Sequence, residues 1–349
     1  MPSESVDLVI VGQRGGTNVG ASLHRAAVRA GTKALFVDSG RAWTAVRPIR
    51  ILYWRLAGHR PPRLGRLSRE LLDLCSSVRP RFVLCTGLAP IHALTLRRIG
   101  RLGTLRLNYL TDDPWNPGLG GGWFFRSLRE YDHVFSVRRA NMNDLEQHGC
   151  PKVSYIPFGF DSELACADVL SVQEQRRYQA DVVFVGGADA QRLPYIAALG
   201  QAGFNLALYG DYWGRDRRTR SFDRGHADPV TIRKATLGAS VALCMVRHAN
   251  RDGQVMRSYE TAAIGACMLV EDTPEHRELF GADGDTVVYF HDTTSMLTRL
   301  SELLNRPLER LRLARAVRQR ILSGGHTYDD RLRTMLSSAR NHMEHASVS

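Results

Sequence analysis

Two carboxylates with helical spacing stand out in the stretch RDGQVMRSYETAAIGACMLVEDTPEHRELF, residues 251–280. Asp252 lies in a turn, and Glu260 lies two helical turns further on, in an amphipathic helix that we expect from about Val255 to a stop at Gly265. The first turn of a helix presents unpaired backbone N–H groups and the positive end of the helix dipole, so it can hold a diphosphate. A ribose diol would then lie near Glu260.

Two glycine-containing loops follow apolar stretches that predict strands. In VGGADAQR, Gly186 and Gly187 allow a ligand to approach the backbone, and Arg192 can reach a phosphate. A plain turn between a strand and a helix is the alternative. In VGQRGGTNVG, Gly15 and Gly16 offer a second such loop, but the spacing is not the G-x-G-x-x-G of NAD-binding proteins.

A pair of adjacent carboxylates, Asp112 and Asp113, ends the apolar stretch LRLNYL and precedes Pro114. Ligands of α/β folds bind at the carboxyl ends of strands, so the pair could act as a base toward an acceptor hydroxyl. It could equally cap the turn. The two residues are not a spaced Asp-x-Asp, and no His/Cys/Asp cluster has metal-ligand spacing, so we expect neither metal nor cofactor.

The segment RPIRILYWRLAGHRPPRLGRLSRE interleaves arginines with Tyr53, Trp54 and aliphatic residues. This composition predicts contact of residues 47–69 with an anionic membrane or a phosphorylated, lipid-linked acceptor. A loop and helix that merely cover the sheet are the alternative. The arginines are residues 47, 50, 55, 60, 63, 66 and 69.

Short apolar runs alternate with helical stretches along the whole chain, which predicts two doubly wound α/β domains. The helix ASLHRAAVRAG should end at Gly31. Everything from Thr293 onward is expected to be helical, and the last helix must dock on an existing surface. The runs that predict buried parallel strands are residues 7–12, 34–39, 81–87, 105–110, 133–138, 181–187, 204–210, 240–246, 267–272 and 285–292.

The predicted domains are residues 1–160, residues 161–325 and a C-terminal crossover helix, 326–349. The division follows from the length of 349 residues, which exceeds what one core fills, and from a Pro- and Gly-containing hinge at 154–161. A polar stretch over 161–180 then separates the two halves.

Charge and composition bear on the class of binding partner and on the cellular compartment. The net charge of +12 predicts an anionic partner, but 44 of the 47 basic residues are arginines spread over the chain, which a GC-rich genome also explains. The cysteines are scattered, there is no basic leader, and no apolar run approaches the roughly 18 residues of a membrane span. We therefore expect a cytoplasmic protein that binds peripherally at the inner face of the membrane.

The stretch 251–280 resembles the Glu, seven residues, Glu motif of retaining glycosyltransferases of the GT-B architecture. It is more similar still to the spore-maturation CgeB-like group, with its Arg-x-x-Glu, small helix, Gly, strand, acidic turn and Leu-Phe pattern. The resemblance continues through DTVVYFHD, HTYDDR (326–331) and NYLTDDPWN (108–116), so it covers most of the chain from about residue 105. Asp252 stands where the wider family has Glu.

The resemblance implies two Rossmann-like domains that face a central cleft. It also implies that Glu260 binds ribose hydroxyls, that Asp252 faces the sugar, and that Gly15 and Gly16 approach the sugar and acceptor. Arg257 and backbone N–H groups would hold the diphosphate, and those groups belong to Gly253, Gln254, Val255 and Met256.

We therefore expect a metal-independent glycosyltransferase that moves a sugar from a nucleotide-diphosphate donor to an acceptor hydroxyl. The acceptor would be a cell-surface glycan, a lipid-linked molecule or a protein, and retention of anomeric configuration is implied by the resemblance alone. A GT-B-type sugar-nucleotide epimerase shares both domains and remains an alternative. A basic nucleic-acid-binding protein would explain only the charge.

Overall fold

The computed structural model describes residues 6–119 and 121–346, with side chains up to residue 340. The chain divides into two compact units. The first comprises Met1–Pro157, Ala249–Arg251 and Tyr328–Ser349, and the second comprises Phe158–His248 and Asp252–Thr327. The chain enters the second unit after Pro157, returns to the first unit for Ala249–Arg251, and returns to it again at Tyr328.

The first unit is built on a six-stranded parallel sheet with the order β2-β1-β3-β4-β5-β6. All five residues of β1 are buried, as expected for a strand covered on both faces. The strands are β1 (Leu8–Gly12), β2 (Ala34–Asp38), β3 (Phe82–Thr86), β4 (Leu105–Leu110), β5 (His133–Ser136) and β6 (Val153–Tyr155). β6 overlaps the segment that was predicted to be a hinge. It was not predicted as a strand, because three half-buried residues give no alternating pattern.

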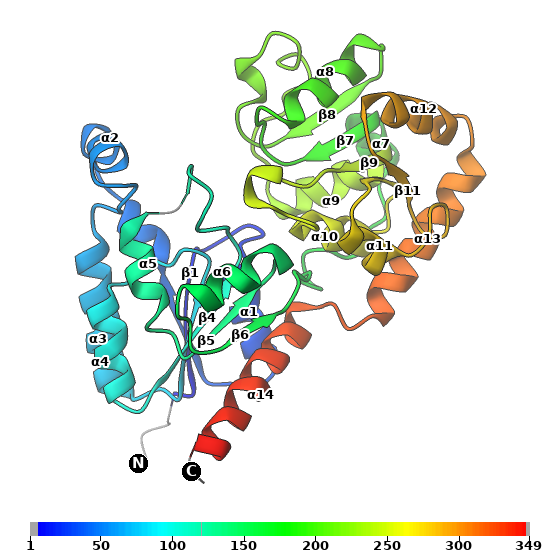
Figure 1. Cartoon of the computed structure of the whole chain (residues 1–349). Helices are drawn as coiled ribbons and strands as arrows, with labels where there is room; N and C mark the ends of the chain where they lie inside the picture. Colours follow the sequence, from blue (N-terminus) through cyan, green and yellow to red (C-terminus); the bar gives the residue numbers. More distant parts are fainter. Residues whose placement is uncertain (1–5, 120, 347–349) are drawn as a thin grey trace. The chain divides into compact units, whose positions relative to one another are not determined.

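The first unit contains seven α-helices in the described part of the chain. They are α1 (Val19–Arg29), α2 (Arg47–Leu56), α3 (Leu64–Val78), α4 (Ala93–Arg101), α5 (Gly122–Leu128), α6 (Met142–Gln147) and α14 (Tyr328–Ala346). α2 projects away from the sheet (Figure 1). α4 packs against both α3 and α5. The turn after α1 places Gly31 at φ +68°, the left-handed conformation that glycine adopts without strain.

The final helix α14 docks on α1, as the lack of a following strand required. Arg29 on α1 forms an ion pair with Asp329, with 2.6 Å between Nη2 and Oδ2. The predicted crossover helix runs to residue 349, and its residues 347–349 lie outside the described residues.

The second unit has a five-stranded parallel sheet with the order β11-β10-β9-β7-β8. Its strands are β7 (Ala180–Val185), β8 (Leu206–Tyr209), β9 (Ala239–Cys244), β10 (Met268–Glu271) and β11 (Val288–Phe290). Its helices are α7 (Val172–Tyr178), α8 (Arg192–Gln201), α9 (Pro229–Gly238), α10 (Met256–Ile264), α11 (Pro274–Phe280), α12 (Thr293–Leu304) and α13 (Pro307–Ser323). The ten predicted strands therefore form the two sheets, and the two-domain α/β prediction is confirmed.

One helix was not predicted, and one local prediction was wrong. The polar stretch 161–180 contains a helix, α7, which begins at a reciprocal pair of hydrogen bonds between Ser171 and Glu174. The helix α10 ends at Gly265 as expected, but it is not amphipathic, because its last seven residues are all buried. α10 packs against α13 as well as α9, and a single sequence window cannot reveal a second covering helix.

Candidate functional site

The carboxyl ends of three neighbouring strands define the candidate site of the second unit. β7, β9 and β10 are adjacent in the sheet, and each is followed by a loop that holds predicted residues. Because parallel strands end at the same edge of a sheet, the loops that follow them meet there.

The turn before α10 is held close to α11. A Cβ on Gly253 would lie 2.1 to 2.5 Å from the carboxyl group of Glu275, so a larger residue could not fit without displacing that side chain. Thr273 donates a hydrogen bond from Oγ1 to the carbonyl oxygen of Gly253, 2.5 Å away. At the start of the helix, the backbone N–H of Val255 donates to Ser258 Oγ at 3.2 Å. The first turn of α10 is thereby fixed in position.

The two predicted acids lie where the spacing put them, one before α10 and one within it. Asp252 is 9% exposed in the turn, and Glu260 is 5% exposed on the helix. Glu260 forms an ion pair with Arg257, one turn earlier on the same helix. Burial raises the pKa of Glu260 above its ordinary value, and the charge of Arg257 opposes that rise. α10 thus carries a buried carboxylate and its counterion behind its N-terminal turn.

A buried histidine ties this helix to its neighbours. His276 Nδ1 donates to the carbonyl oxygen of Glu271 at 2.7 Å, and Nε2 lies 2.8 Å from Ser258 Oγ. Nδ1 must carry the proton to donate to a carbonyl, so Nε2 of the neutral ring accepts from the hydroxyl. Burial lowers the pKa of His276 to about 4. The ring therefore acts as a neutral clamp between α10, α11 and β10.

Sequence reasoning missed Glu271, the last residue of β10. One carboxylate oxygen of Glu271 accepts from the backbone N–H of Val246 at 2.9 Å, and the other lies 2.5 Å from His248 Nε2. The acid at the end of the MLVE strand was the available signal. Its relation to His248, which follows a different strand, required the sheet order.

The loop after β7 holds the predicted Gly186, Gly187 and Arg192. Arg192 is buried, and its guanidinium donates to the carbonyl oxygens of Met245 at 3.0 Å, Val246 at 3.3 Å and Gly187 at 3.4 Å. Burial lowers the pKa of Arg192. These contacts favour a positioning role that joins the loops after β7 and β9, and a direct phosphate contact of Arg192 stays a prediction.

In the first unit, the loop after β1 requires glycine. Gly15 and Gly16 have φ values of +77° and +55°, and a Cβ on either would meet no atom within 4 Å. Backbone conformation, and not lack of space, therefore selects glycine at both positions. Asn18 Nδ2 donates to the carbonyl oxygen of Gly15 at 2.8 Å and shapes the loop.

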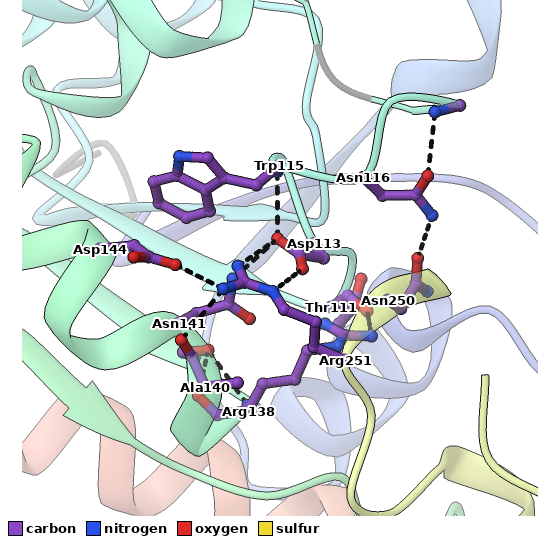
Figure 2. Close-up of polar contacts among 12 residues, drawn as sticks. Thr111, Asp113, Trp115, Asn116, Arg138, Ala140, Asn141, Asp144, Asn250 and Arg251 are labelled. Carbon is purple, nitrogen blue, oxygen red and sulfur yellow. Dashed lines mark hydrogen bonds and ion pairs between the residues drawn. The ribbon is translucent and has the colours of Figure 1, made fainter. Parts of the chain in front are cut away.

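The two predicted acids of the first unit differ in their surroundings (Figure 2). Asp113 is 1% exposed and forms a bidentate ion pair with Arg251, with Nε to Oδ2 at 2.6 Å and Nη2 to Oδ1 at 3.0 Å. It also accepts from the backbone N–H of Trp115 and from Asn141 Nδ2. Asp112 is half-buried, and among the described side chains its carboxylate contacts Thr111 Oγ1, at 3.4 Å.

Arg251 is a second residue that the sequence did not single out. Its guanidinium also contacts Asp144, with Nη1 to Oδ2 at 2.6 Å, and lies over the ring of Trp115 (Figure 2). The hydrogen bond to Asp113 is the largest cause that raises the pKa of Arg251. Asp113 accepts hydrogen bonds from four donor atoms, which favours the alternative that it caps the turn. A catalytic role for Asp113 stays a prediction.

Metal ligation and membrane spanning can be judged for the described residues, 6–119 and 121–346. No group of three or more His, Cys, Asp or Glu side chains there is arranged to hold a metal ion. No helix in that part of the chain is long and apolar enough to cross a membrane.

Comparison with known proteins places this geometry in a family context. Residues 192–337 match the model of a family described as Glycosyl transferase-like. The crystal structure of a sucrose-phosphate synthase from Thermosynechococcus elongatus superposes with a TM-score of 0.67 at 11% identity, covering 98% of this chain and 100% of that chain. The chain has a glycosyltransferase-like domain and the GT-B fold.

Two further solved structures share this fold. The Anabaena HepE protein, solved in complex with UDP-glucose, has a TM-score of 0.65 at 12% identity and covers 95% of this chain and 99% of its own. A putative UDP-N-acetylglucosamine 2-epimerase from Listeria monocytogenes has a lower TM-score of 0.57 at 11% identity, covering 98% and 97%. No curated protein matched the sequence. At these identities the structures establish the fold of this chain.

Proposed function

We propose that this protein is a glycosyltransferase whose second unit binds a nucleotide-diphosphate sugar. The observation that carries the proposal is the Glu260–Arg257 pair inside α10. Burying a carboxylate costs several kcal/mol unless its charge is compensated. A buried, partly compensated carboxylate just behind a helix N-terminus has the chemistry needed to receive ribose hydroxyls while the helix receives phosphates.

The donor-binding roles follow from position. Backbone N–H groups of 253–256 and Arg257 would hold the diphosphate, and Glu260 would accept hydrogen bonds from the ribose. Asp252 would face the sugar. The glycines 186 and 187 would let the donor approach the backbone, with Arg192 fixing their loop.

On the acceptor side, we assign the base role to Asp112 in preference to Asp113. A base needs an accessible, unpaired carboxylate near the hydroxyl that it deprotonates. Asp112 is half-buried, and its carboxylate contacts Thr111 Oγ1. The Asp113 carboxylate instead accepts from Arg251 and from two other donor groups, and this local structure would be lost if Asp113 acted as a base. Gly15 and Gly16 would approach the acceptor.

Three finer properties belong to the same proposal. Membership of the CgeB-like group and retention of configuration rest on the sequence resemblance. Independence of metal rests on the helix dipole and Arg257, which can stabilise the leaving diphosphate as a cation would.

The helix α2 supports peripheral contact with an anionic membrane. None of its ten residues is buried. Ile49, Leu52 and Leu56 are spaced on one face of the helix and are 43%, 52% and 79% exposed. Arg47 and Arg55 lie off this stripe, as do the exposed Ile51 and Trp54, so the helix combines exposed apolar and cationic side chains as interfacial helices do.

The test of the proposed function is Glu260→Gln, which keeps the shape of the side chain and removes its charge. We expect affinity for the matching nucleotide among UDP, GDP and dTDP to fall about 10- to 100-fold, since a hydrogen bond to a charged group contributes about 1.5–3 kcal/mol. Glu302→Gln on α12 is the matched control, because Glu302 is an exposed glutamate of the same unit. Nucleotide affinity that is the same for Glu260→Gln and Glu302→Gln would refute the assignment.

The epimerase alternative is decided by product. Incubation with the bound nucleotide sugar and analysis by NMR would show either transfer of the sugar or inversion at C2. Inversion without transfer would replace glycosyltransfer by the epimerase activity.

A further inference from the structure

A cavity of about 330 Å³ in the first unit is lined by four arginines and by no acidic residue. Arg60 follows α2, Arg69 lies on α3, Arg98 on α4 and Arg126 on α5. Within the described part of the chain, none of the four forms an ion pair with a carboxylate. Their neighbours differ in this respect, since Arg97 pairs with Glu130.

No acidic side chain on the cavity wall balances these arginines, of which Arg69, Arg98 and Arg126 are exposed and Arg60 is half-buried. Cations gathered around one cavity repel each other, and a protein surface ordinarily intersperses acids among them. The mutual influence is visible at His92 on the cavity wall, where burial and then Arg60 and Arg126 lower the pKa. The cluster therefore has the electrostatic character of a site for a multiply charged anion.

The backbone adds donors to the same cavity. α4 follows β3 after the loop 87–92, and Ala93 and Leu94 of its first turn line the cavity. The helix has no side-chain cap, and the first amides that bond back to His92 are those of Thr95 and Leu96. An anion beside this turn would meet free N–H groups and the positive end of the helix dipole.

Two buried donors on the wall lack acceptors. Trp123 is 6% exposed, lines the cavity, and its indole Nε1 has no hydrogen-bond partner among the described residues. Arg60 Nε is likewise buried without an acceptor. Both atoms are closed to solvent in this structure, so a ligand in the cavity would reach them only after a rearrangement of the wall.

We propose that this cavity binds a phosphate or diphosphate group of the acceptor substrate. The inference rests on the proposed glycosyltransferase function and names the chemical class of its acceptor. Guanidinium groups and helix amides match phosphate oxygens, and a single carboxylate would neutralise too little of the charge. The volume lies at the lower end of the range for small-molecule sites, so it accommodates a phosphorylated head and not a whole glycan.

The binding test uses the full chain without a nucleotide donor. Pyrophosphate and glucose 6-phosphate are titrated while tryptophan fluorescence is recorded, and Trp123→Phe identifies the share of the signal from the cavity. We expect Arg98→Gln/Arg126→Gln to weaken binding at least 100-fold, since each charged hydrogen bond contributes about tenfold or more. The matched control is Arg97→Gln/Arg129→Gln, which removes two exposed arginines one and three positions away on the same helices or their caps.

A second arm identifies the source of the phosphate. Vesicles of zwitterionic lipid with and without a polyprenyl phosphate are tested for binding to the same variants. Binding that depends on Arg98 and Arg126 with the soluble phosphates assigns a soluble acceptor, and the same dependence only with polyprenyl phosphate assigns a lipid-linked one.

Failure of this inference is distinct from failure of the proposed function. Equal affinity of the wild type and Arg98→Gln/Arg126→Gln for every probe would overturn it, as would an equal loss in the Arg97→Gln/Arg129→Gln control. UDP, GDP or dTDP binding through Glu260 would persist in either case, because Glu260 belongs to the other unit.

Discussion

Acidification should loosen the second unit through one residue, His276. The pKa of His276 in the fold is about 4, against an ordinary value of 6.5, because burial disfavours the imidazolium. Between these pH values the unfolded chain binds a proton that the folded chain does not, so the free energy of unfolding falls as pH falls. Lowering the pH from 7 to 5 should therefore cost about 2 kcal/mol.

The structure supplies the reason for this size. Both ring nitrogens are engaged in the neutral form, one toward the Glu271 carbonyl and one toward the Ser258 hydroxyl. A proton on Nε2 would face that hydroxyl as a second donor, without water to solvate the charge. The hydroxyl would have to rotate and give up its own bond.

Hydrogen exchange of peptides covering α10 and α11 measures the effect locally. After correction for intrinsic exchange, protection should fall roughly 30-fold from pH 7 to pH 5 in the wild type, which is 2 kcal/mol converted by RT. His276→Asn keeps a donor for the Glu271 carbonyl and should abolish most of the fall. Ser258→Ala removes a group that does not titrate. This variant should have lower protection at both pH values and should keep the fall between pH 7 and pH 5.

Equal falls in the wild type and in His276→Asn would refute the reasoning, because the titrating group would then lie elsewhere. A wild type with no fall would refute it too.

Three further predictions concern the first unit, metal and membranes. Arg251→Met should lower the free energy of unfolding of the first unit by about 2–3 kcal/mol, because it leaves the buried Asp113 carboxylate without its counterion. Arg251→Met/Asp113→Asn should recover part of this loss. Urea unfolding measures both changes. Sugar transfer should survive EDTA, and activity that is lost and then restored by Mg²⁺ or Mn²⁺ would contradict the metal-independent mechanism. Wild type should float with vesicles of anionic lipid and release at 1 M salt, where the Debye length is about 3 Å, whereas Arg47→Glu/Arg55→Glu should not float. Equal, salt-insensitive flotation of both proteins would leave α2 without a membrane role.

Much of the fold could be predicted from local sequence. Buried parallel strands are short apolar runs bounded by turn residues, so ten of the eleven strands are visible in the sequence. The stop of α10 at Gly265 is equally local, because a left-handed residue favours glycine, and φ there is +94°. β6 was missed, since three half-buried residues carry no periodic signal.

The candidate site was predictable only where its residues share one element. Asp252 and Glu260 lie a fixed number of residues apart around one helix start, so their relation is set by helix geometry. The sequence also showed Arg257 beside Glu260, but not that the pair would be buried. That burial needed α9 and α13, which come from other parts of the chain.

Contacts between distant segments were decided by the tertiary structure alone. Arg251 lies 138 positions from Asp113 in the sequence, yet it occupies that carboxylate. His276 joins Ser258 to the end of β10. Three helices and the loop before α3 each place one arginine around a single cavity. The sequence specifies each side chain and much of its local conformation. Whether that side chain is buried, and whether a partner neutralises its charge, depends on strand order and helix packing. These bring together residues that no local pattern connects.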